Sequence, residues 1–415
     1  MSLKLIKISL LTLFALASLS ASAVAEDALR AWGLSGSNSA QAHGLGAVGR
    51  NPALLAATGA DGFYLGLASL GLNLGNNTLS LSRYNEISGA VLDSQDKDDL
   101  LADVPSSGLR VDAGMEASVL GFRKGRFALS GQLLGRGGGN MDRDVFELVL
   151  LGNEIDRAFS FDDTDGQGYA IGAATLSYAH PLRAVSNWNL SAGVNIHYLY
   201  GLFEFRALDV SGGITTSIDG LDGSARAEFL TSRGGSGYAL DLGFAAEMNK
   251  VWKLGLMWKG LLGSMNWNKE VEHRLWTADA DGILLGQDDI DEAIEKSDST
   301  WAGDPYSGQV PQVLRLGILR DWSQFTLALE TELRMRGLQG EETGPAAMLG
   351  GEWRALSWLR PRLGLGVGSG AQGSVAGLGL HFGAFRMDFF GGVRGGYLPG
   401  GAQGLTLGSA FSLDF

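Results

Sequence analysis

The sequence predicts an all-β fold, an antiparallel transmembrane β-barrel of about 14 strands (about 12–16) with an N-terminal hatch-like segment. Three observations predict it: an export signal, repeated short segments in which apolar and polar residues alternate, and the aromatic residue Phe415 ending the last such segment. Glycine accounts for 63 of 415 residues, whereas cysteine is absent. Disulfides and thiolate metal sites are therefore excluded, and the fold must close through hydrogen bonds between strands.

The N-terminus has the pattern of a secretory signal peptide. Lys4 and Lys7 precede the apolar run Ile8–Leu19, and small residues follow as far as Ala25. The run is too short for a transmembrane helix, which needs about 20 apolar residues. We therefore expect cleavage near Ala25 and localisation of the mature protein in the cell outer membrane. The predicted divisions are a signal peptide at 1–25, a hatch or lead-in at 26–62, and the barrel at 63–415.

Alternation of apolar and polar residues is clearest in six segments. Between Phe325 and Arg334, for example, Leu327 and Leu329 share one face while Glu330 and Glu332 share the other. In a membrane barrel the apolar face meets lipid and the polar face lines the lumen. A soluble β-sandwich has the same period and remains the alternative. The candidate lumen-lining residues are Glu330, Glu332, Arg334, Arg386 and Asp388. The six segments are 190–200, 238–248, 252–258, 325–334, 385–389 and 405–415.

The last segment ends at the last residue, with Phe411, Leu413 and Phe415 on its apolar face. This ending resembles that of outer-membrane barrels, in which the assembly machinery recognises a terminal aromatic strand. The resemblance implies that these three residues are an assembly signal. It also implies outer-membrane lipid and the barrel-assembly machinery as partners.

Three long connections, near 85–116, 136–168 and 269–310, carry most of the negative charge. With the second counted from Arg143, they hold 26 of the 45 acidic residues but only 7 of the 32 basic ones. We expect them to face outward, and an acidic surface disfavours nucleic acid as a partner. Within them, helical spacing predicts short caps at Asp144–Ile155 and Asp288–Lys296.

One stretch of the third connection is similar to a calcium-binding EF-hand loop. Asp279, Asp281 and Asp288 occupy its third, fifth and twelfth positions. Thr277 replaces the first ligand, and position twelve is Asp where Glu is usual. These three residues are the candidate calcium ligands, and a solvated surface is the alternative interpretation. No cofactor is predicted.

The sequence does not predict an enzyme. Its five histidines are scattered, at 43, 180, 197, 273 and 381, without an HExxH motif, and no GxSxG elbow is present.

The region 44–81, GLGAVGRNPALLAATGADGFYLGLASLGLNLGNNTLSL, joins a small-residue segment to the triplet Asn51-Pro52-Ala53 and to the first strand. It resembles the hatch and first strand of the FadL-type outer-membrane barrels, which include transporters of hydrophobic compounds. The stretches 310–317, 361–366 and 376–380 are similar to the closing strands of that superfamily, in a branch without an assigned function. The resemblance implies that Asn51, Pro52 and Ala53 lie in a hatch inside the barrel. An ordinary periplasmic lead-in to the first strand is the alternative.

Two functions follow as hypotheses. The first is a passive outer-membrane channel or binding protein for a small hydrophobic ligand, with the hatch as its gate. The second is a barrel that does not transport and that anchors or presents a secretion or surface partner through its acidic loops. An apolar pocket against the hatch favours the first, and a lumen filled with ion pairs favours the second.

Overall fold

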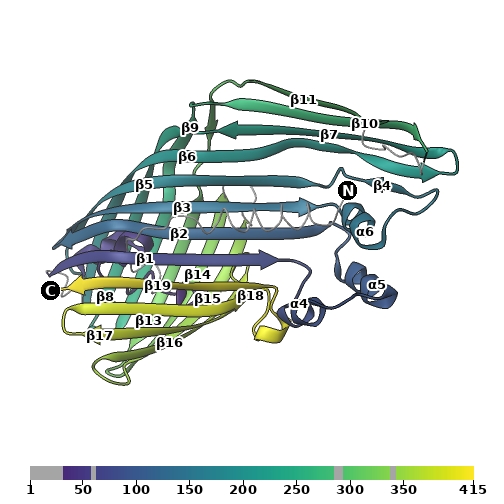
Figure 1. Ribbon diagram of the computed structural model, residues 1–415. Coiled ribbons are helices and arrows are strands. Elements are labelled where there is room, and N and C mark those ends of the chain that lie inside the picture. The colour runs from purple at the N-terminus through teal and green to yellow at the C-terminus, as the bar shows by residue number, and fades with distance from the viewer. Residues whose placement is uncertain (1–30, 58–61, 285–292, 337–342) are drawn as a thin grey trace.

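The computed structural model describes residues 31–57, 62–284, 293–336 and 343–415. Within them, 14 antiparallel strands form a closed barrel around the N-terminal segment (Figure 1), which confirms the predicted fold class. The predicted signal peptide lies outside the described residues. In ring order the barrel strands are β1 (Phe63–Asn76), β2 (Leu109–Lys124), β3 (Phe127–Met141), β5 (Asp165–Pro181), β6 (Trp188–Ser217), β8 (Gly235–Met248), β9 (Trp252–Trp267), β13 (Gln312–Asp321), β14 (Phe325–Arg336), β15 (Gly344–Trp353), β16 (Leu359–Gly368), β17 (Gly373–Phe382), β18 (Phe385–Arg394) and β19 (Gly404–Asp414).

The first and last strands pair with each other and close the ring. Leu65 of β1 lies opposite Leu413 of β19, and Leu72 lies opposite Leu407. Closure removes both sheet edges, whose unpaired backbone groups would be costly in lipid.

The wall of the barrel is apolar outside and polar inside. Along β14, Phe325, Leu327, Leu329 and Leu333 are exposed, while Thr326, Ala328, Glu330 and Glu332 are buried. Leu329 is 47% exposed and Glu330 is 1% exposed. A water-soluble sandwich would bury the leucines and expose the glutamates, so this pattern fits a barrel in lipid.

At the end of the barrel that holds the C-terminus, neighbouring strands are joined by short turns (Figure 1). Between β8 and β9, Asn249 and Lys250 have φ values of 52° and 59°. Two consecutive left-handed residues give a type I′ turn, whose twist matches that of the flanking strands.

The connection predicted as an acidic loop at 269–310 is largely β-structure, so that part of the prediction is wrong. β10 (Glu272–Ile283) and β11 (Glu295–Ala302) form a hairpin, β10 also pairs with β7 (Gly220–Ser232), and β7 pairs with the distal half of β6. These strands project beyond the barrel (Figure 1), and we call them the blade. A strand outside the membrane needs no apolar face toward lipid, so an acidic sequence can still form a strand there. Two short strands, β4 (Ala158–Ser160) and β12 (Tyr306–Gly308), pair with β6 and β9.

The other two long connections are shorter than predicted, because β2 begins at Leu109 and β3 ends at Met141. The first holds α4 (Leu81–Ile87) and α5 (Ser94–Asp103), and the second holds α6 (Arg143–Leu151), where a helix was predicted. The helix predicted at 288–296 falls partly outside the described residues, and Glu295 and Lys296 belong to β11. A 3-10 turn, η2 (Pro399–Gly401), precedes β19. Among the described residues, no helix has the length and apolar character needed to cross a membrane.

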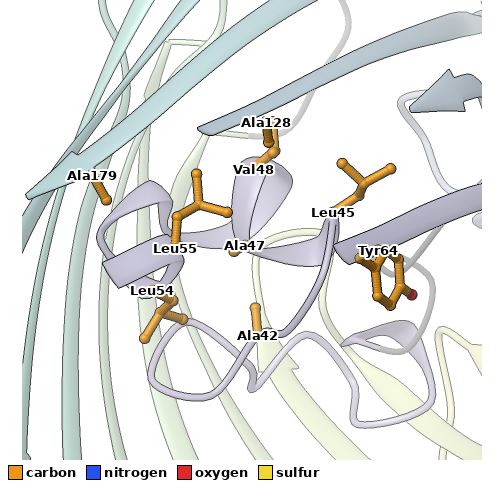
Figure 2. Close-up of a cluster of buried hydrophobic side chains, with 9 residues drawn as sticks. All are labelled: Ala42, Leu45, Ala47, Val48, Leu54, Leu55, Tyr64, Ala128 and Ala179. Carbon is orange, nitrogen blue, oxygen red and sulfur yellow. The ribbon is translucent and has the colours of Figure 1, made fainter. Parts of the chain in front are cut away.

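Residues 31–57 lie inside the barrel, and we call them the hatch. They contain α3 (Gly46–Arg50) and the 3-10 helix η1 (Pro52–Ala56). Figure 2 shows Leu45, Val48 and Leu55 of the hatch packed with Tyr64 of β1 and Ala128 of β3. The hatch thus has an apolar core shared with the wall at the short-turn end.

Candidate functional site

The side chain of Asn51 holds the centre of the hatch. It is fully buried, and its Nδ2 donates to the carbonyl oxygens of Ser39 (3.1 Å) and of Phe244 in β8 (2.9 Å). Its Oδ1 accepts from the backbone N–H of Ala53 at 3.1 Å and so caps η1. Pro52 occupies the first turn of η1, where its fixed φ suits the helix and its missing N–H costs nothing. The three residues predicted from the family resemblance therefore form one rigid turn that is hydrogen-bonded to the wall.

The wall meets this turn at glycines that face inward. A Cβ at Gly193 of β6 would lie 2.6 Å from the carbonyl oxygen of Pro52, and a Cβ at Gly243 of β8 would lie 2.8 Å from its Cδ. Distances below about 3 Å do not occur for real Cβ atoms, so only glycine fits. Further wall glycines against the hatch are Gly121, Gly255, Gly317, Gly350 and Gly364. Glycine abundance was visible in the sequence, but which glycines contact the hatch was not.

The predicted lumen-lining residues of β14 form an ion-pair network. Glu330 and Glu332 are buried, and Glu330 Oε2 accepts from the backbone N–H of Ser39 in the hatch at 2.7 Å. Glu332 pairs with Arg334 and with Arg315 of β13, each at 2.8 Å. Arg315 was not predicted, because alternation identifies the face of a residue but not its partner across strands.

The two predicted residues of β18 lie elsewhere in the lumen, at the short-turn end. Asp388 is buried and pairs with Arg362, which also pairs with Glu352 at 2.7 Å. Arg386 pairs with Asp414 at 3.2 Å. The five predicted residues therefore belong to separate ion-pair groups.

A third polar chain joins three strands to the hatch. Thr175 Oγ1 lies 2.7 Å from Nδ1 of His197, whose Nε2 lies 2.7 Å from Oδ2 of Asp241. Asn195 donates to the same carboxylate at 2.9 Å and to the carbonyl oxygen of Val48 in the hatch at 2.8 Å. The order hydroxyl, imidazole, carboxylate is that of a hydrolytic triad, but Thr175 has no exposed surface, so a substrate cannot reach its hydroxyl. We therefore assign these hydrogen-bonded side chains a structural role, which is to hold the hatch against the wall.

The hatch lies between cavities at the two ends of the lumen. A cavity of about 600 Å³ opens toward the end that carries the helices and the blade, and Arg50 of the hatch lines it. Two smaller cavities, of about 320 and 370 Å³, lie at the short-turn end, where Gln41 and His43 of the hatch line them. Passage through the lumen would therefore require the hatch to move.

A family model described as a family of unknown function, DUF5723, matches residues 52–393. The chain belongs to this family. A comparison with curated proteins finds no match.

The fold of this DUF5723 member is similar to those of solved transporters. The toluene transporter TodX of P. putida matches with a TM-score of 0.52 and 12% identity, over 93% of this chain and 97% of that one. The toluene transporter TbuX of Ralstonia pickettii matches with a TM-score of 0.51 and 14% identity, over the same shares. The resemblance to FadL-type barrels is therefore confirmed for the fold.

Two of the three candidate calcium residues lie in a strand and not in a loop. Asp279 and Asp281 lie in β10, where Asp279 is paired with Ser224 and Glu295, and Asp288 lies outside the described residues. A calcium loop needs its ligands to converge around a tight turn, whereas side chains two residues apart in a strand are held side by side on one face, about 7 Å apart. Among the described residues no group of three or more acidic, His or Cys side chains converges on a metal position.

Two of the predicted assembly residues lie in the closing strand of this DUF5723 member, and Phe415 directly follows it. Phe411 and Leu413 are half-buried, and Phe411 packs edge-on against Phe389 of β18 at a centroid distance of 5.9 Å. Phe415 is exposed, and its ring centroid lies 6.1 Å from that of Phe63 at the start of β1.

Proposed function

We propose that the protein is a passive channel of the outer membrane for small compounds with an apolar body, and that the hatch is its gate. The observation that carries the proposal is the position of the hatch between the cavities of the lumen. The similarity in fold to two toluene transporters supports the choice of small apolar compounds.

The contacts of the hatch are suited to a gate. Within the described residues it is held by non-covalent contacts, including the hydrogen bonds of Ser39 to Glu330, Asn51 to Phe244 and Val48 to Asn195. The barrel is closed by its own strands and does not need the hatch for closure. The hatch can therefore shift while the wall stays folded.

Pro52→Gly tests the gate. The substitution frees the φ angle of the pinned turn, so we expect a looser hatch, larger single-channel currents in planar bilayers and faster uptake of hydrophobic compounds. The wall should remain folded, with unchanged migration on gels before and after heating. Pro399→Gly, in the exposed turn η2, is the matched control and should leave the currents unchanged. Unaltered permeability of a folded Pro52→Gly variant would remove the support for a gate.

The blade and the ion pairs favour a second candidate, a barrel that presents a partner. All residues of β11 are exposed, and Arg274 Nε of β10 donates to Asp298 of β11 at 2.9 Å. That hydrogen bond lowers the pKa of Asp298, so the pair stays charged at neutral pH. If the protein presents a partner, Pro52→Gly should not change the permeability. Removal of the hairpin 272–302 should then abolish partner binding.

A further inference from the structure

The wall of the large cavity is strongly charged, with an excess of cations. Eight basic and five acidic side chains line it. Sites for purely apolar ligands are lined mainly by apolar side chains, whereas this lining also offers partners for a charged group. The basic residues include Arg50, Lys259 and Arg315, and the acidic ones include Glu116 and Glu332.

Three of these cations gather where the hatch meets the wall. Arg50 is the last residue of α3 and is only 9% exposed. Lys259 of β9 lies opposite Val313 of β13, so Lys259 and Arg315 are diagonal neighbours on the inner face. Both Arg50 and Lys259 interact electrostatically with Arg315. Glu116, Glu330 and Glu332 attract Arg50 and offset part of the repulsion among these three cations.

The acidic residues nearby leave part of this charge unpaired. Glu332 is shared between Arg315 and Arg334, and Glu330 accepts from the backbone of Ser39 and lies 4.0 Å from Arg315 Nε. Arg315 is 8% exposed, and its Nη1 is buried without a hydrogen-bond partner among the described residues. In the part of the chain described here, the side chains of Arg50 and Lys259 make no hydrogen bond either. A buried donor such as Arg315 Nη1 is costly unless a ligand or water satisfies it.

Apolar surface lies directly beside the cations. The Arg50 guanidinium and the Met348 methyl group lie 3.8 and 3.6 Å from the position that a Cβ on Gly36 would take. Trp32 lines the same cavity. A ligand with its charged group on Arg50 would thus place an apolar body against Met348.

We infer that the large cavity binds the anionic group of a small organic acid through Arg50, Lys259 and Arg315. The inference rests on the proposed function and names the substrate class of the same channel. Guanidinium groups bind carboxylate and phosphate oxygens in pairs, and the Lys259 ammonium adds a third donor. Because Arg50 belongs to the hatch and the other two belong to the wall, the bound anion joins the gate to the barrel.

Three probes with the same ring and different charges test the inference: benzoate, benzyl alcohol and benzylamine. Their affinities for the purified full-length barrel are measured by calorimetry at neutral pH. We expect benzoate to bind at least about tenfold more tightly than the other two, and salt to weaken its binding. Inorganic phosphate is then tested as a competitor of benzoate. If phosphate displaces benzoate, the site binds any compact anion. If phosphate does not displace it, the site requires a carboxylate with an apolar body. Equal affinities for the three aromatic probes would overturn the inference.

Substitutions identify the residues. Arg50→Gln and Lys259→Gln should each weaken benzoate binding by about tenfold and leave benzyl alcohol unaffected. Lys259 is on the wall, so its variant answers the objection that Arg50→Gln merely displaces the hatch. The control is Arg354→Gln, which removes a cation at the other end of the lumen, where Arg354 pairs with Asp321 at 2.8 Å. Benzoate affinity that is unchanged in both cavity variants would contradict the assignment.

The proposed function and the inference fail separately. If Pro52→Gly increases the permeability but the barrel shows no preference for benzoate, the inference is overturned and the proposed channel function still stands. Tight, Arg50-dependent benzoate binding with unaltered permeability in Pro52→Gly supports the anion site and overturns the gate.

Discussion

Gly193 marks a place where the hatch packs directly on the wall, and it gives the sharpest prediction for a single residue. In Gly193→Ala the new methyl group would overlap Pro52 and Ala53, at a cost of about 1–3 kcal/mol to the packing of the hatch. We expect the hatch to become accessible to protease while heating still changes the gel migration of the barrel. Gly391→Ala is the control, because a Cβ there has no neighbour within 4 Å. Equal protease protection of the hatch in both variants would contradict the contact.

For individual lumen residues, the alternation of apolar and polar positions predicted which face of the strand each residue occupies, but not its ion-pair partner. Glu330, Glu332 and Asp388 are buried in the lumen because each alternates with residues that face lipid. Their partners Arg315 and Arg362 come from neighbouring strands, and register between strands is not encoded in the period of one strand. The role of Arg50 was equally hidden, since a single arginine in a small-residue segment has no distinctive pattern.

Among the elements, the closing strand carries the clearest prediction. Deleting residues 411–415 removes the partners of Leu65 and Ala68 in β1 and exposes an unpaired edge to lipid. We expect the truncated protein to fail to insert, measured by its absence from the outer-membrane fraction. Deleting residues 295–299 of the exposed strand β11 removes the same length of chain outside the barrel and should leave insertion intact. Normal insertion of the first variant would contradict the role of the terminal strand.

Barrel strands were easier to predict than the blade. Lipid imposes an apolar residue at every second position, so barrel strands such as β14 are visible in the sequence. β10 and β11 lie beyond the barrel, and β11 is exposed along its whole length, so its sequence EKSDSTWA has the composition of a loop. The acidic connections were predicted to be too long and too irregular for the same reason, because strands outside the membrane lack the alternating apolar residues.

The whole molecule combines a lipid-facing wall with a plugged, charged lumen, and this predicts its location. We expect membrane fractionation to recover the protein from the outer membrane, without residues 1–25, as a species whose gel migration changes on heating. Recovery from the soluble periplasm would contradict the barrel in lipid.

The central claim is that the hatch fills the lumen and that passage requires it to move. The chain has no cysteine, so the claim can be tested with one engineered disulfide, Val48→Cys with Ala128→Cys, which joins the hatch to β3 where these two buried side chains pack in one cluster (Figure 2). Single-channel conductance is measured for the oxidised and reduced double variant, with each single variant as a control. The account predicts that the disulfide forms and that the oxidised barrel stays closed, while reduction restores conductance. Failure of the two cysteines to join, or the same conductance in both states, would contradict it.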